Sequence, residues 1–211
     1  DSSGFTILRK PADSSQDAEK IVSINHQTYL KAILPDGETA LLDNSRQTGN
    51  ANISTVVLKP DARPTMLINT QFNEYGACAS PDGRWLAYQS DESGRPEIYV
   101  RELAGSGGRW PISTEGGEEP RWSFDGKELY YRINEQLMAV PVDTRSTFHV
   151  GTPVSLFNEV YDLRSNTGET YDVDPHGGRF LMIRPPKGDS SAQLRIVVNW
   201  YEEVRRLIPA K

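Results

Sequence analysis

The chain has 211 residues, of which 36% are apolar and 25% are charged, and its formal net charge is −6. Nucleic acid is not expected as a partner, because the acid excess is spread along the chain and no basic cluster is larger than Arg205-Arg206. Direct membrane insertion is not expected either, since no apolar run approaches the roughly 20 residues that cross a bilayer, and the one cysteine, Cys78, excludes an internal disulfide framework.

Residues 4–23 predict two strands, and the rest of the chain shows one succession of elements four times. Each unit has a strand, a tetrapeptide turn, a second strand and a third strand. In the second unit the strands are YGACAS (75–80), RWLAYQS (84–90) and EIYVREL (97–103). The small residues of the first strand suit a crowded inner position, whereas the second strand is apolar on both faces, as in a sheet packed between two neighbours. Segments PTMLI (64–68) and RWPIS (109–113) predict outer fourth strands.

The tetrapeptide turn occurs as Leu34-Pro35-Asp36-Gly37, Ser80-Pro81-Asp82-Gly83, Ser123-Phe124-Asp125-Gly126 and Asp174-Pro175-His176-Gly177. The third residues lie 46, 43 and 51 positions apart, in or near the range of four-stranded propeller blades. In a type I turn, proline suits the second position, aspartate the third, and glycine the left-handed position that follows. We therefore predict turn roles for Pro35, Asp36, Gly37, Pro81, Asp82, Gly83, Asp125, Gly126, Pro175 and Gly177.

The stretch ASPDGRWLAYQSDESGRPEIYVREL (79–103) resembles the TolB-type, WD-like propeller repeat that is common in bacterial multidomain proteins. The resemblance is good at 122–142, weaker at 34–58 and weakest at 173–200, where His176 replaces aspartate. The ending VVNWYEEVRRLIPAK also resembles the terminus of large bacterial proteins that carry such propellers, several of which begin with a serine/threonine kinase or DNA-binding domain. Such a resemblance identifies a fold much better than a function.

The predicted fold class is all-β: a β-propeller of four-stranded antiparallel blades, about four to five of them in this chain, with a short C-terminal helix. The predicted units are the end of a preceding blade (1–24), blades at 25–68, 72–113 and 118–157, an incomplete last blade (168–200) and the helix (200–208). Seventeen strands are expected in these units. Either the chain is the C-terminal part of a longer protein, which we favour, or its partial blades complete one another within or between chains.

The sequence lacks the local motifs of several enzyme classes, and we expect it not to be an enzyme. The nearest match to the G-x-S-x-G nucleophile elbow is AGSGG at 104–108, which begins with alanine, and the kinase signatures are missing. The three histidines lie far apart, at His26, His149 and His176. Asp172, Asp174 and His176 could bind a cation, but the turn pattern explains this segment better, so we expect no metal and no cofactor.

In propellers, the loops that lead into the innermost strands surround one mouth of the central channel. Alignment of the four units places eight residues there: His26, Tyr29, Glu74, Tyr75, Glu119, Arg121, Glu169 and Tyr171. Tyrosine, arginine and carboxylate side chains are plausible recognition groups. The alternative is that they are solvated or pack between blades.

Three hypotheses for function follow. The first is a non-catalytic, sensory or interaction propeller that binds a protein or peptide. The second is the regulatory C-terminal domain of a bacterial serine/threonine kinase or transcriptional regulator, and the third is a propeller that gates a peptidase. A homo-oligomer, or N-terminal blades supplied by a longer chain, would complete the partial blades, and the sequence leaves the cell compartment open.

Overall fold

The computed structural model describes residues 5–44, 50–105, 107–145, 147–158, 169–175 and 179–183. All regular secondary structure in these ranges is β, in seventeen strands, which confirms the all-β prediction. None of these residues forms a helix long and apolar enough to span a bilayer. The predicted helix at 200–208, the third strand of the last unit, and the turn residues His176 and Gly177 all lie outside the described residues.

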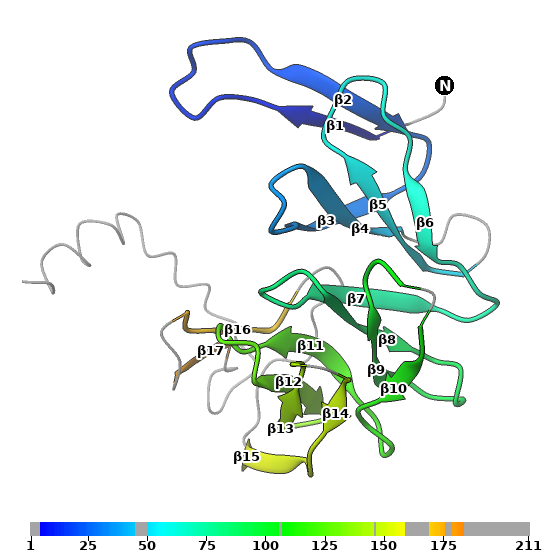
Figure 1. Cartoon of the computed structure of the whole chain (residues 1–211), viewed down its shortest axis with the longest axis vertical. Helices are drawn as coiled ribbons and strands as arrows, with labels where there is room; N and C mark the ends of the chain where they lie inside the picture. The colour runs from blue at the N-terminus through cyan, green and yellow to red at the C-terminus, as the bar shows by residue number, and fades with distance from the viewer. Residues whose placement is uncertain are drawn as a thin grey trace, which may run out of the picture.

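The strands form five antiparallel sheets. Figure 1 shows the first four in chain order, from β1–β2 at the top to β15 at the bottom, with β16–β17 at the left. The first sheet contains β1 (Phe5–Arg9) and β2 (Glu19–Ile24). The second contains β3 (Thr28–Ile33), β4 (Thr39–Asn44), β5 (Asn52–Val57) and β6 (Thr65–Ile68). The third contains β7 (Glu74–Ala79), β8 (Trp85–Ser90), β9 (Glu97–Glu102) and β10 (Arg109–Pro111).

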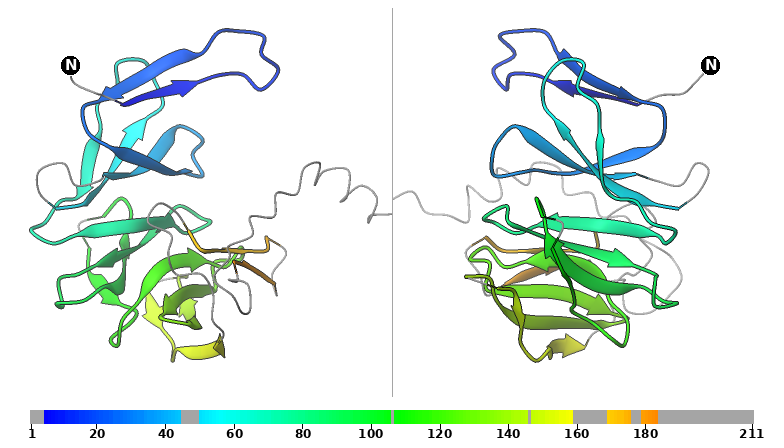
Figure 2. Two further views of the ribbon diagram at one scale, coloured as in Figure 1. Left: turned by 180° about the vertical axis from the view of Figure 1, so that it is seen from behind. Right: turned by 45° about the vertical axis from the view of Figure 1, so that its right-hand side comes forward.

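The fourth sheet has five strands, because two short segments pair with different parts of the long strand β13. It contains β11 (Glu118–Trp122), β12 (Glu128–Ile133), β13 (Gln136–Asp143), β14 (His149–Val150) and β15 (Val154–Asn158). The last sheet pairs β16 (Tyr171–Val173) with β17 (Phe180–Met182). The two views of Figure 2 show the same succession of sheets from other sides.

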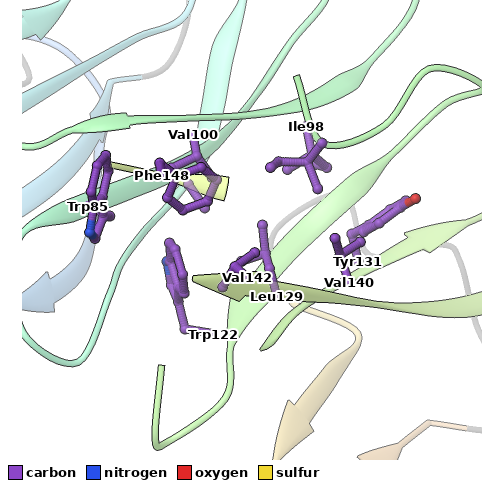
Figure 3. Packing of buried hydrophobic residues seen from close by; sticks show 11 residues of the cluster. Trp85, Ile98, Val100, Trp122, Leu129, Tyr131, Val140, Val142 and Phe148 are labelled. Carbon is purple, nitrogen blue, oxygen red and sulfur yellow. The ribbon is translucent and has the colours of Figure 1, made fainter. Parts of the chain in front are cut away.

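The sheets pack face to face, and the apolar core is divided among their interfaces. In β8, Trp85 and Ala87 belong to the core between the third and fourth sheets, whereas Leu86 and Tyr88 belong to the core between the second and third. Successive side chains of a strand point to opposite faces, so a strand covered on both sides can be apolar at successive positions. Figure 3 shows the first of these cores, where Trp85 and Val100 face Trp122 and Val142, and Phe148 packs against the indole of Trp85 at 4.9 Å between ring centroids.

The tetrapeptide turns join the first and second strands of the second, third and fourth sheets. In the third sheet the turn is closed by a backbone hydrogen bond from Gly83 N to Ser80 O of 2.9 Å, and Ser80 Oγ accepts from Trp85 N at 2.9 Å. The turn of the fourth sheet has the same bonds, from Gly126 N to Ser123 O and from Glu128 N to Ser123 Oγ. The three turn glycines share a φ near +70°, at Gly37, Gly83 and Gly126.

Neighbouring turns are also in contact with each other. A Cβ atom placed on Gly83 would lie 3.1 Å from Cδ of Pro35, in the turn of the preceding sheet, and one on Gly126 would lie 3.7 Å from Cδ of Pro81. Gly37 has no atom within 4 Å of such a Cβ. The proline of one turn therefore packs beneath the glycine of the next.

Candidate functional site

The strands β3, β7, β11 and β16 each lie at one edge of their sheet, and these edges adjoin. β7 packs against β3 on one side and β11 on the other. Thr170 and Tyr171, at the start of β16, are hydrogen bonded to Glu119 of β11. We call these the inner strands, because the rest of each sheet extends away from them.

A cluster of charged side chains links the inner strands of three sheets. Lys31 of β3 and Arg121 of β11 both contact the same oxygen of Glu169, with Nζ and Nη2 at 2.6 Å and 2.5 Å from Oε1. Lys31 and Glu169 are 138 residues apart in the chain. Burial by itself would raise the pKa of Glu169, but the hydrogen bond from Lys31 and the charge of Arg121 outweigh it and lower the pKa. The carboxylate is therefore held in its charged form.

Asp43 extends this cluster behind Lys31. Its carboxylate accepts hydrogen bonds from the backbone N–H groups of Gly76 (2.8 Å) and Ala77 (3.3 Å) on β7, and it lies 3.9 Å from Lys31 Nζ. Burial raises the pKa of Asp43, and Lys31 and the two N–H groups oppose this. Gly76 has a φ of +67°, which glycine adopts at little cost and which accompanies the register shift where β7 pairs with β8.

Glu119 connects the fourth sheet to the start of β16. Its Oε2 accepts from the backbone N and Oγ1 of Thr170 at 2.9 Å and 2.7 Å, and its carbonyl accepts from the Tyr171 hydroxyl at 2.8 Å. Arg132 lies 3.9 Å from Glu119 Oε1 and also donates to Thr170 Oγ1. Glu119 has a φ of +55°, a conformation that costs a residue other than glycine about 1–3 kcal/mol and persists only where the surrounding structure holds it. These bonds provide that support. We refer to Lys31, Asp43, Glu119, Arg121, Arg132 and Glu169 together as the inner charge network.

Four of the eight residues predicted at a channel mouth meet here: Glu119, Arg121, Glu169 and Tyr171. Burial raises the pKa of the Tyr171 phenol well above its ordinary value, which suits its role as a hydrogen-bond donor.

The other four have separate environments. His26 bonds to the neighbouring Asn25 side chain, and Tyr29, which is exposed, accepts from Gln27 at 2.5 Å. Tyr75 is exposed, whereas Glu74 is buried and accepts from Thr70.

Sequence reasoning missed Lys31, Asp43 and Arg132, although the sequence carried a signal for two of them. Asp43, Gln89 and Arg132 each stand six residues after the turn glycine, in a strand that is otherwise largely apolar. All three side chains are buried, and buried polar groups need partners. Each bonds to the inner strand of the following sheet or to the residue before it. Asp43 accepts from the N–H groups of Gly76 and Ala77, Gln89 Oε1 accepts from Glu119 N at 3.3 Å, and Arg132 donates to Thr170 Oγ1. Lys31 has no equivalent in the other units.

A hollow of about 410 Å³ lies elsewhere, between the loop at 93–97 and residues 111–114. Its buried carboxylate, Glu97, is paired with Arg95 Nε at 2.8 Å and accepts from Gly116 N at 2.9 Å. These bonds hold the two loops together. Within the described ranges, no three histidine, cysteine, aspartate or glutamate side chains are grouped as metal ligands.

No protein-family model matches the chain. Among solved structures it is similar to TolB from Acinetobacter baumannii, with a TM-score of 0.56 and 18% identity over 87% of this chain and 44% of that one. It is also similar to a proposed TolB from Agrobacterium tumefaciens (TM-score 0.55, 18% identity, 74% of this chain and 61% of that one). A periplasmic gluconolactonase from Pseudomonas aeruginosa matches with a TM-score of 0.53 and 13% identity, over 82% of this chain and 54% of that one.

These matches confirm that the fold is a TolB-like β-propeller. At 18% identity they establish the fold and not the function. The chain spans 61% and 44% of the lengths of the two TolB structures.

The gluconolactonase corrects one prediction. We expected the chain not to be an enzyme, but a protein described as a lactonase has the same kind of fold. The prediction was wrong because it treated the absence of hydrolase and kinase motifs as the absence of chemistry. One fold carries many functions, and reactive groups can be assembled from several blades without a local motif.

Proposed function

We propose that this chain is the binding module of a propeller protein and holds a segment of a protein or peptide partner beside the inner strands β3 and β11 and the start of β16. The observation that carries the proposal is the meeting of Lys31, Arg121 and Glu169 from three sheets, with Glu169 partly open to solvent. Charged groups on a rigid framework can recognise a ligand with little cost of ordering. The similarity to TolB supports a protein as the kind of partner.

Selection of peptides from a random display library on the purified chain tests this proposal. Enriched peptides should lose their binding to a Lys31→Met/Arg121→Met variant. They should keep it with Lys127→Met, which removes an exposed charge in the turn of the fourth sheet. Failure to enrich any peptide, or equal binding to both variants, would count against a site at the inner charge network.

A second candidate is turnover of a sugar lactone, which the gluconolactonase neighbour suggests. Hydrolysis of gluconolactone by the purified chain above the spontaneous rate, lost in Glu169→Gln, would support it. Because the chain spans less than two thirds of its structural neighbours, a regulatory role in a kinase or transcriptional regulator, or a gate for a peptidase, stays a prediction about a longer protein.

A further inference from the structure

Lys31 and Arg121 lie deeper than the carboxylate they share. Their side chains are 15% and 13% exposed, whereas that of Glu169 is 44% exposed. Glu169 therefore lies over the two cations on the solvent side, and it is the member of the inner charge network that a ligand can reach first.

The two cations have few other partners among the described residues. Asp43, the second carboxylate near Lys31, is 3.9 Å away and already accepts two backbone N–H groups. Arg121 Nη1 donates to the carbonyl of Pro120 at 3.0 Å, which carries no negative charge. Removing Glu169 would thus leave two largely buried cations without their closest anion, and a buried charge without its partner is costly.

The position of Glu169 shows which ligand these cations accept. A lysine and an arginine from different sheets converge on one carboxylate oxygen, Lys31 through a charge-assisted hydrogen bond and Arg121 through an ion pair. We propose that Lys31 and Arg121 form a carboxylate-binding subsite, that Glu169 occupies it when no partner is bound, and that an acidic group of the partner displaces Glu169. This inference rests on the proposed function, since it assigns the chemistry of the same site.

Glu169→Gln tests the proposal, because it weakens the internal occupant and leaves both cations in place. Fluorescence anisotropy would measure binding of a labelled ten-residue Gly/Ser peptide with three glutamates and an amidated C-terminus. Freeing the subsite should tighten binding about tenfold relative to the wild type, since charge-assisted bonds are about twice as strong as neutral ones. The gain should disappear when Lys31→Met or Arg121→Met is added.

Glu19→Gln is the matched control. Glu19 is 43% exposed and pairs with Arg9 at 2.6 Å, so the variant loses one ion pair of an exposed carboxylate, in the first sheet, which contains no member of the inner charge network. This variant should bind the peptide as the wild type does. Glu169→Ala provides a second way to free the subsite, and thermal unfolding of each variant verifies that it is folded.

Three results would overturn the proposal: equal affinity of the wild type and both Glu169 variants, an equal gain for a peptide with glutamine in place of glutamate, or a gain for a phosphoserine peptide alone. If library-selected peptides bind without any dependence on Glu169, the subsite is refuted and the proposed function stands. If succinate binds Glu169→Gln through Lys31 and Arg121 while no peptide does, the subsite stands and the proposed function fails.

Discussion

The contact between successive turns predicts that the same glycine-to-alanine substitution has different costs in the three turns. Gly37, Gly83 and Gly126 have φ values of 69°, 69° and 70°, so alanine at each position meets the same left-handed backbone, at a cost of about 1–2 kcal/mol. The three sites differ in the space available to the new Cβ atom. It would meet nothing at Gly37, Pro81 Cδ at 3.7 Å at Gly126, and Pro35 Cδ at 3.1 Å at Gly83.

A separation of 3.7 Å is an ordinary van der Waals contact, but 3.1 Å to a ring carbon requires the ring or the backbone to move. Overpacking of this kind costs about 1–3 kcal/mol in addition to the backbone term. We therefore expect Gly83→Ala to lower the free energy of unfolding by about 1–3 kcal/mol more than Gly37→Ala does. The effect of Gly126→Ala should be close to that of Gly37→Ala. Urea unfolding with a common slope gives the three free energies.

The cause of the difference can be isolated with Pro35. In a Pro35→Ala background the ring atoms that obstruct Gly83→Ala are gone, so its cost should fall to that of Gly37→Ala, and the double-mutant cycle should show coupling of the same size. Equal losses at all three glycines, or a loss at Gly83 that persists without Pro35, would refute the argument that the turns are in contact.

Three further predictions concern single side chains. Asp43→Leu removes the acceptor of the Gly76 and Ala77 N–H groups and should cost about 1–3 kcal/mol for each donor left unpaired, as measured by urea unfolding; a loss no larger than that of Asp43→Asn, which keeps one acceptor, would contradict this. The folded-state pKa of Glu169 lies below its ordinary 4.5, so the ionised carboxylate stabilises the wild type relative to Glu169→Gln. The difference in the free energy of unfolding between the two proteins should be fully present above pH 4.5 and should fall as pH drops through the lowered pKa. A difference that stays constant between pH 3 and 6 would contradict the lowered pKa. Phe124 occupies the turn position that proline fills at 35 and 81, so Phe124→Pro should stabilise the chain by about 0.4–1 kcal/mol in thermal unfolding, and a lowered midpoint would show a different turn backbone.

The fold could be predicted largely because its local signals agree with its packing. The turn sequences at 34–37, 80–83 and 123–126 mark the positions where the chain reverses between two strands. Strands such as WLAYQS begin with successive apolar residues because neighbouring sheets cover both faces. The pairing of both β14 and β15 with β13 could not be foreseen, since neither short segment carries a pattern that specifies its partner.

The site was only partly predictable, and the reason is geometric. Arg121 and Glu169 could be placed by alignment of the units, because Arg121 lies in the inner strand β11 and Glu169 shortly before the inner strand β16. The contact of Lys31 with Glu169 depends on how sheets far apart in the chain are brought together, and no local pattern encodes that distance. Asp43 could have been noticed as a carboxylate within a buried apolar strand.

The three polar side chains that bridge consecutive sheets have a consequence for shuffling the units of this protein. Asp43 and Gln89 are acceptors for backbone N–H groups of the following sheet, whereas Arg132 is a donor to Thr170 and lies near Glu119. Exchanging the second strands of the second and fourth sheets would set a guanidinium against N–H donors and a carboxylate against Glu119. Despite their common turn, the units are therefore not interchangeable modules, and their order along the chain is fixed by polar matching as well as by shape.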